Sequence, residues 1–177
     1  HIGLLGSKEA IRSAKTEIIN GLTDHGILVV NGDDSFLFDY VRNIIPLNNG
    51  LAAVFAGQKQ PGTVTNCPAY INAYDIEENN GTDFNVTSLI NGVPSELGMH
   101  HIGLGGEHNV RNACFALLCA KLLGADMQKA ARALSEYVPM DGRGKTDYGK
   151  KYTIINDAYN ASPESMMAAF SNLDLTN

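Results

Sequence analysis

Cysteine, basic residues and long apolar runs are all scarce in this sequence, and each shortage excludes a class of protein. The three cysteines, Cys67, Cys114 and Cys119, are an odd number without the spacing of a metal site. Lysine and arginine total 13 against 19 acidic residues, and the net charge of -6 argues against nucleic acid as a partner. There is no signal-peptide pattern and no apolar run long enough to span a bilayer, so we expect no membrane contact and a reduced, cytoplasmic location.

Apolar residues, in contrast, are abundant enough to indicate a folded domain. The chain has 177 residues, 44% of them apolar, which is enough for one domain with a hydrophobic core. Cys114 and Cys119 fall within an apolar helical run, so we expect both to be small core residues. The sequence starts at His1 rather than at methionine, and we expect it to be a piece of a longer protein.

The first third of the sequence predicts a helix followed by a strand, a helix and a strand. Two short continuous apolar runs, at 26–30 and 51–55, are typical of parallel strands covered on both faces. The turn-forming residues 31–34 can cap a following helix. This order implies a right-handed crossover and a doubly wound sheet. The predicted elements are a helix over 7–19 capped by Ser7, a strand over 26–30, a helix over 36–44 and a strand over 51–55.

The rest of the sequence predicts an antiparallel meander and then mostly helices. Between residues 63 and 104, strand-like runs are separated by Asn-Asn-Gly and Asn-Gly, which are clear hairpin signals. The apolar width of 107–123 predicts a helix buried on most sides. Further predicted elements are a helix over 126–138, a Gly-rich loop over 141–146, a strand over 152–155 and a helix over 162–173. The predicted fold class is α/β, with a mostly parallel, doubly wound sheet flanked by helices and extended by an antiparallel meander.

The segment IINDAYNASPESM is the most informative part of the chain. Its apolar start predicts a buried strand that ends in a carboxylate, and the edge where such strands end is where open α/β sheets keep their ligand sites. Ser162 and Pro163 fit the start of the next helix. Asp157, Tyr159 and Asn160 would then lie on a strand-to-helix loop. From the residues alone, a tight turn is an equal alternative, with Asp157 bonded to backbone amides and Asn160 in a left-handed conformation.

Three segments, in order along the chain, resemble motifs of the Mur ligases. DAYNASPESM, at 157–166, is similar to the D-x-Y-N-A-N-P-x-S-M signature of the dipeptide-adding branch, and HIGLLGSKEAIRSAKTEI, at 1–18, and GEHNVRNA, at 106–113, match two further segments. The family's phosphate-binding loop, G-x-x-x-x-G-K-[ST], is missing from these residues, and in the family it lies upstream. The resemblance implies a P-loop-NTPase-like central ATP-binding domain. Residues 1–161 would be its C-terminal part, and 162–177 the start of the linker and C-terminal domain.

The resemblance implies a metal-related role for two residues near the N-terminus. In Mur ligases, the lysine that Lys15 matches is carbamylated and helps to hold the second Mg2+ ion, and His1 matches a histidine that approaches the same ion. Carbamylation needs a neutral amine, which burial or a neighbouring cation favours. From the residues alone, Lys15 fits a surface lysine paired with Glu9 or Glu17, and His1 fits an ordinary polar residue.

The resemblance also implies nucleotide contacts at the start of the helix predicted over 107–123. Asn109 and Asn112 are three residues apart and therefore share one helical face. In the family such asparagines face ATP, so we expect both to contact the nucleotide, with His108 as a weaker contact. A polar helix cap, with Glu107 and His108 bonded to backbone, is the alternative.

Three further positions are implied in nucleotide binding. Arg143 matches a family arginine near the phosphates, for which a planar, permanent cation is well suited, although a solvated loop residue is the plain alternative. Asp157 matches the carboxylate that binds the ribose hydroxyls. Tyr159 and Asn160 would line the adenine pocket or the hinge to the next domain.

The function implied by the resemblance is ATP-driven amide formation in bacterial peptidoglycan synthesis. The enzyme would join D-alanyl-D-alanine to UDP-N-acetylmuramoyl-tripeptide through an acyl phosphate, using ATP and Mg2+, as a monomer in the cytoplasm. Without the phosphate-binding loop, this stretch alone is expected to be inactive. Two alternatives stay open: another amide ligase of the superfamily, such as a folylpolyglutamate synthase, and a non-catalytic nucleotide-binding module.

Overall fold

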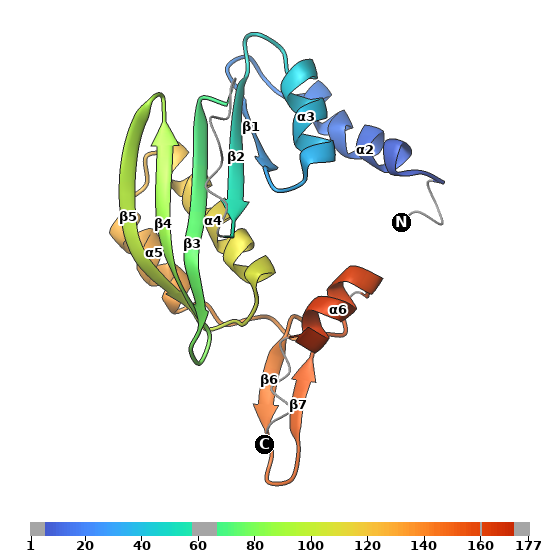
Figure 1. Ribbon diagram of the computed structural model, residues 1–177, viewed down its shortest axis with the longest axis vertical. Helices are drawn as coiled ribbons and strands as arrows, with labels where there is room; N and C mark the ends of the chain where they lie inside the picture. Colours follow the sequence, from blue (N-terminus) through green and yellow to red (C-terminus); the bar gives the residue numbers. More distant parts are fainter. Residues whose placement is uncertain (1–5, 58–66, 160, 172–177) are drawn as a thin grey trace. The chain divides into compact units, whose positions relative to one another are not determined.

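The computed structural model of the protein describes residues 6–57, 67–159 and 161–171. These residues fall into two compact units. The first unit runs to Tyr74 and also contains Val86–Gly98, and the second consists of Asp75–Asn85 and the chain from Met99 onward. Figure 1 labels the helices and strands of both units.

The first unit opens with α2 (Lys8–Thr16), whose start is capped as predicted. The Ser7 hydroxyl accepts a hydrogen bond from the backbone N–H of Ala10 at 3.1 Å, which satisfies one of the free donors at the helix start. The helix is shorter than predicted because the chain tightens into a 3-10 turn, η1 (Glu17–Gly21). Such tightening is a common way to satisfy the last carbonyl groups of a helix.

A parallel pair of strands joined by a helix follows, as predicted. β1 (Ile27–Asn31) and β2 (Gly50–Ala56) pair in parallel, and α3 (Ser35–Ile44) connects them. Asp34 caps α3, since its carboxylate accepts a hydrogen bond from the backbone N–H of Leu37 at 3.1 Å. The buried residues of this unit's core cluster are Ile19, Leu28, Val30, Phe38, Val41, Leu51, Ala53, Phe55 and Cys67.

Five strands form one mixed sheet in the order β1-β2-β3-β4-β5 (Figure 1). β3 (Ala69–Glu78) is parallel to β2. β4 (Thr82–Ile90) and β5 (Val93–Ile102) follow through connections too short for a crossover, so these neighbours are antiparallel. Asn91 and Gly92 have φ of 50° and 78°, as the predicted two-residue hairpin requires. The predicted α/β class with an antiparallel meander is confirmed.

In the second unit, α4 (Glu107–Leu122) packs against α5 (Met127–Ser135). The prediction that α4 is buried on most sides is wrong, because the helix buries one stripe at spacings of three and four residues. Cys114 is buried as predicted, but Cys119 is exposed. It follows the buried Leu118 by one residue, and a helix turns by about 100° per residue. The buried stripe consists of Val110, Ala113, Cys114, Leu117 and Leu118.

The chain then forms a separate hairpin and a final described helix. β6 (Lys145–Tyr148) and β7 (Thr153–Asn156) form an antiparallel sheet of two strands. The predicted buried strand at 152–155 is therefore wrong, since Ile154 and Ile155 are 60% and 46% exposed. A short apolar run indicates a strand but does not say how many neighbours will cover it.

Helix α6 (Pro163–Ser171) begins as predicted, because the Ser162 hydroxyl accepts a hydrogen bond from the backbone N–H of Ser165 at 3.1 Å. Its first residue is the proline expected in a first turn. Within the described ranges, every helix is too short or too polar to cross a bilayer.

Candidate functional site

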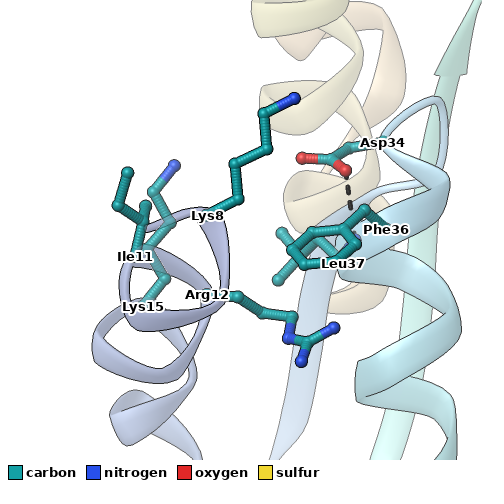
Figure 2. Close-up of a pocket in the computed structure, with 7 residues that line it drawn as sticks. All are labelled: Lys8, Ile11, Arg12, Lys15, Asp34, Phe36 and Leu37. Carbon is teal, nitrogen blue, oxygen red and sulfur yellow. Dashed lines mark hydrogen bonds between the residues drawn. The ribbon is translucent and has the colours of Figure 1, made fainter. Parts of the chain in front are cut away.

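A pocket of about 300 Å³ lies between α2 and the start of α3, and Lys15 lines it (Figure 2). Lys15 is exposed and makes no ion pair with any described residue, so the structure does not show the alternative pairing with Glu9 or Glu17. The lining residues are Lys8, Ile11, Arg12 and Lys15 from α2, and Asp34, Phe36 and Leu37 from the start of α3.

Positive charge dominates this pocket, although the whole chain is acidic. Arg12 is held by aromatic rings, with the centre of its guanidinium 4.2 Å from the Phe36 ring centroid and 4.0 Å from that of Tyr40. Among the described residues that line the pocket, Asp34 supplies the single carboxylate, and it already caps α3. The two lysines on α2 therefore face a site with an excess of cations, which favours an anionic group.

The start of α4 carries the asparagines predicted to contact a nucleotide. Asn109 is half-buried, and its amide N–H donates to the Gly105 carbonyl oxygen at 2.8 Å. His108 and Asn112 are exposed. Glu107 forms an ion pair with Arg111 at 2.7 Å instead of capping the helix, so the alternative of a cap made by Glu107 is not supported.

The chain that leads into α4 is held by the last residue of β3 and the first residue of β4, which were not among the predicted site residues. Glu78 accepts a hydrogen bond from the backbone N–H of Gly106 at 3.0 Å, and the buried Thr82 donates its hydroxyl to the Leu104 carbonyl oxygen at 2.7 Å. Glu78 and Gly106 are 28 residues apart, so only the fold brings them together. The sequence offered only an indirect signal: the N-cap residue of α4 is Gly106, which has no side chain to cap the helix, so a residue from elsewhere in the chain was needed.

A hydrogen-bonded pair of side chains lies beside these contacts. Asp83 and the Nδ1 atom of His101 are 2.7 Å apart, and Asn79 donates to the same carboxylate at 3.1 Å. The hydrogen bond with His101, and then that with Asn79, lower the pKa of the Asp83 carboxyl from its ordinary value. The pair ties the end of β5 to the start of β4.

The hairpin formed by β6 and β7 brings Arg143 and Tyr159 together. The guanidinium centre of Arg143 lies 3.6 Å from the Tyr159 ring centroid. Backbone bonds join the same two loops: Tyr159 N–H donates to the Gly142 carbonyl at 3.1 Å, and Gly144 N–H donates to the Asn156 carbonyl at 2.9 Å. The cation and the ring thus form one surface.

Asp157 lies next to this surface with its carboxylate exposed. The turn expected at Asp157 uses its neighbour instead, because the side chain of Asn156 accepts from Ala158 N–H at 3.4 Å. Among the described residues nothing bonds the Asp157 carboxylate, which leaves it available to a ligand. Two further predicted site residues, His1 and Asn160, lie outside the described residues.

The predicted site residues therefore occupy three places in the chain. Lys15 belongs to the first unit, and the start of α4 and the Arg143–Tyr159 surface belong to the second. Over the described ranges, no group of three or more His, Cys, Asp or Glu side chains could hold a metal ion.

Comparison with known proteins identifies relatives for nearly the whole chain. The Mur ligase middle domain matches residues 1–120. A UDP-N-acetylmuramoyl-tripeptide--D-alanyl-D-alanine ligase from Bacillus subtilis is 35% identical over 172 residues, which is 96% of this chain and 33% of the relative. The chain thus spans about a third of the length of the curated relatives it matches.

Solved structures show the same fold. A MurF from Acinetobacter baumannii superposes with a TM-score of 0.75 at 24% identity, over 95% of this chain and 33% of that one. A MurF ligase from Thermotoga maritima, solved in complex with ADP, gives a TM-score of 0.67 at 19% identity, over 94% and 35% of the two chains.

Proposed function

This chain belongs to the Mur ligase family, and we propose that it is the central part of an ATP-dependent ligase that joins D-alanyl-D-alanine to UDP-N-acetylmuramoyl-tripeptide. The observation that carries the proposal is the 35% identity to a ligase of that name, extending over 96% of this chain. The longer protein would work as a monomer in the bacterial cytoplasm and supply the phosphate-binding loop that these residues lack.

Within this proposal, the hairpin of the second unit binds the nucleotide. The Arg143 guanidinium lies over the Tyr159 ring, which would hold a permanent cation in place for phosphate oxygens. The exposed Asp157 carboxylate accepts hydrogen bonds from the ribose hydroxyls, the use that a carboxylate has in other nucleotide sites. Asn109 and Asn112, with His108 beside them, contact the adenine end. Asn160 would line the same pocket.

The pocket beside α2 would lie where the acyl phosphate forms and reacts. A carbamylated Lys15 would be an anion among cations, because Lys8 and Arg12 line the same pocket. Mg2+ would supply electrostatic stabilisation of phosphate oxygens when bound. It prefers oxygen ligands and usually keeps water and substrate phosphates. Among the described residues that line the pocket, Asp34 is the only one with a carboxylate of its own, so the ion would also need the carbamate oxygens of Lys15 and donors from the substrate. His1 is the further donor proposed within this chain.

The proposed reaction has two steps. A carboxylate oxygen of the tripeptide attacks the γ-phosphorus of ATP, so that an acyl phosphate forms and ADP leaves. The amine of D-alanyl-D-alanine then attacks the acyl carbon, phosphate leaves, and the amine loses a proton as the peptide bond forms. Negative charge develops on phosphate oxygens in the first step, and Arg143 is the cation that we propose to stabilise it.

The test is phosphate release by the full-length protein, measured with ATP and UDP-N-acetylmuramoyl-tripeptide in the presence and absence of D-alanyl-D-alanine. Lys15→Ala is expected to lower kcat by about 100-fold or more, as loss of a charge-stabilising group does. Asp157→Ala is expected to raise KM for ATP by about tenfold, since hydrogen bonds to a charged acceptor are lost. Lys129→Ala and Asp24→Ala, which remove exposed charges elsewhere, are matched controls.

The outcomes separate the candidate functions. Phosphate release that needs the dipeptide, with kcat lowered in Lys15→Ala and KM for ATP raised in Asp157→Ala, supports the proposal and the two residue roles. Release with another amino-acid acceptor moves the protein to a sister amide ligase. If the full-length protein releases no phosphate with any acceptor, the ligase proposal is wrong and a nucleotide-binding module remains.

A further inference from the structure

The peptide group between Gly105 and Gly106 is held from both sides, just before α4 begins. Its carbonyl oxygen accepts from the side-chain amide of Asn109 at 2.8 Å. Its N–H donates to the Glu78 carboxylate at 3.0 Å. The C=O and N–H of a trans peptide point in opposite directions, so Asn109 and Glu78 form hydrogen bonds on opposite sides of the same peptide group.

This arrangement replaces an ordinary helix cap. The N-cap residue of α4 is Gly106, with φ of 94° and no side chain to bond the free N–H groups of the first turn. A positive φ gives the backbone here a conformation that most residues avoid. The Glu78 carboxylate fixes this peptide and also brings negative charge to the positive end of the helix.

The consequence for Asn109 follows from the atoms of its amide. Bonding to the Gly105 carbonyl must use the NH2 group, because a carbonyl only accepts. The amide oxygen and the second N–H remain, and this donor and acceptor pair matches the edge of adenine. If the Gly105–Gly106 peptide turned over, Asn109 would lose its acceptor and the amide would lose its orientation.

A second contact from the same turn limits movement of the loop. The hydroxyl of Thr82, a fully buried residue, donates to the carbonyl oxygen of Leu104, the residue before this peptide, at 2.7 Å. The Thr82 bond therefore already fixes the path of this short loop. The Glu78 bond fixes the orientation of one peptide group within it.

We propose that Glu78 is a positioning residue for nucleotide recognition: through the Gly105–Gly106 peptide, it orients the Asn109 amide that selects adenine. The inference rests on the proposed function, because it needs ATP as the ligand of the start of α4. Glu78 itself does not touch the nucleotide.

The test is base discrimination by the full-length enzyme, expressed as the ratio of kcat/KM for ATP to kcat/KM for GTP. Glu78→Ala is expected to lower this ratio by about tenfold, a loss typical of a hydrogen bond to a charged group. Glu78→Gln keeps an acceptor oxygen in the same place and is expected to stay within about threefold of the original protein. Glu77→Ala, an exposed carboxylate one residue earlier on β3, is the matched control and should change nothing.

A double-mutant cycle with Asn109→Ala adds a readout that general destabilisation would not reproduce. Because both residues act through one peptide, the double variant should lose no more discrimination than the worse single variant. Independent losses that multiply would overturn the inference. So would a ratio in Glu78→Ala within about twofold of the original protein, since the expected hydrogen-bond loss is larger.

Loss of folding in Glu78→Ala and loss of ATP turnover in the original protein are each distinguished from failure of the inference. If Glu78→Ala gives no folded protein, Glu78→Asp, whose carboxylate is one methylene short of Gly106, replaces it, and an unchanged ratio there overturns the inference. If the original protein turns over no ATP, the proposed function fails and the inference with it. If ATP turnover is intact and only the ratio in the variants is unchanged, the positioning role alone is wrong.

Discussion

Replacement of Gly81 by alanine should destabilise the protein strongly, because the turn between β3 and β4 has no room for a side chain. Gly81 has φ of 125°, a backbone conformation that residues with a Cβ rarely adopt. A Cβ at this position would lie against the Ile102 carbonyl oxygen, and 3.0 Å from both Gly103 Cα and His101 Cε1. Carbon atoms prefer separations of about 3.5–4.0 Å, so this backbone would have to move by at least roughly half an ångström, and further at the Ile102 carbonyl oxygen, which is the nearest atom.

The expected loss of stability in Gly81→Ala has two contributions. A left-handed backbone conformation costs a residue with a Cβ about 1–2 kcal/mol, and an extra methyl group in a closed space costs about 1–3 kcal/mol. Together they lower the free energy of unfolding by about 2–5 kcal/mol. For a chain of this length each kcal/mol lowers Tm by about 2–4 °C, so Gly81→Ala should lower Tm by about 4–20 °C.

Gly92→Ala is the control, because Gly92 lies in the turn between β4 and β5 with φ of 78° and no atom within 4 Å of an added Cβ. It carries the backbone cost alone, with an expected loss of about 1–2 kcal/mol. Differential scanning calorimetry of the original protein and both variants measures the difference. Equal falls in Tm for the two variants would refute the close approach at Gly81 on which this reasoning depends.

Three further predictions concern a hydrogen-bonded pair, a thiol and a cation. The Asp83–His101 pair lowers the pKa of Asp83, so its stabilisation is fully present above the ordinary aspartate pKa of about 4 and is lost as pH falls through the lower folded value. The stability difference between the original protein and Asp83→Asn, measured by urea unfolding, should therefore shrink as the pH falls; a constant difference would contradict this. Cys119 should be the one thiol of the 177-residue chain that reacts quickly with a disulfide reagent in the folded state, because the other two cysteines are buried. Cys119→Ser should abolish this fast reaction, and a fast reaction of two thiols in the original protein would contradict the prediction. Arg143→Lys should weaken ADP binding about threefold in calorimetry and Arg143→Ala about tenfold, since lysine keeps the charge but loses the planar stacking on Tyr159; equal affinities for the two variants would argue against that stacking.

Features that depend on neighbouring residues were predicted well from the sequence. Ser7, Ser162 and the cluster 31–34 were each expected to cap a helix, and Ser7, Ser162 and Asp34 of that cluster each accept a hydrogen bond from an N–H three residues later. The Asn91-Gly92 hairpin was predicted because few residue pairs tolerate two positive φ angles in succession. Such signals are complete within a few residues, so they can be read without knowing the fold.

The errors and omissions concern which part of the fold covers or contacts a segment. The run that contains Ile154 and Ile155 indicated a strand, but nothing nearby in sequence showed that its partner would be one short strand and not a covered sheet. The ring of Tyr159 under the Arg143 guanidinium was likewise absent from the predictions. Arg143 and Tyr159 were identified separately, each through resemblance to the family.

The sequence by itself determined the family, the helix caps, the hairpin turns and the identity of the candidate nucleotide residues, because each is written in a short stretch of chain. The tertiary structure decided how those residues are supported. Only the folded sheet brings Glu78 to Gly106, and Gly81 to the Ile102 carbonyl. A carboxylate can bond a backbone N–H from any position in the sequence, so the choice of partner depends on where the strands place it.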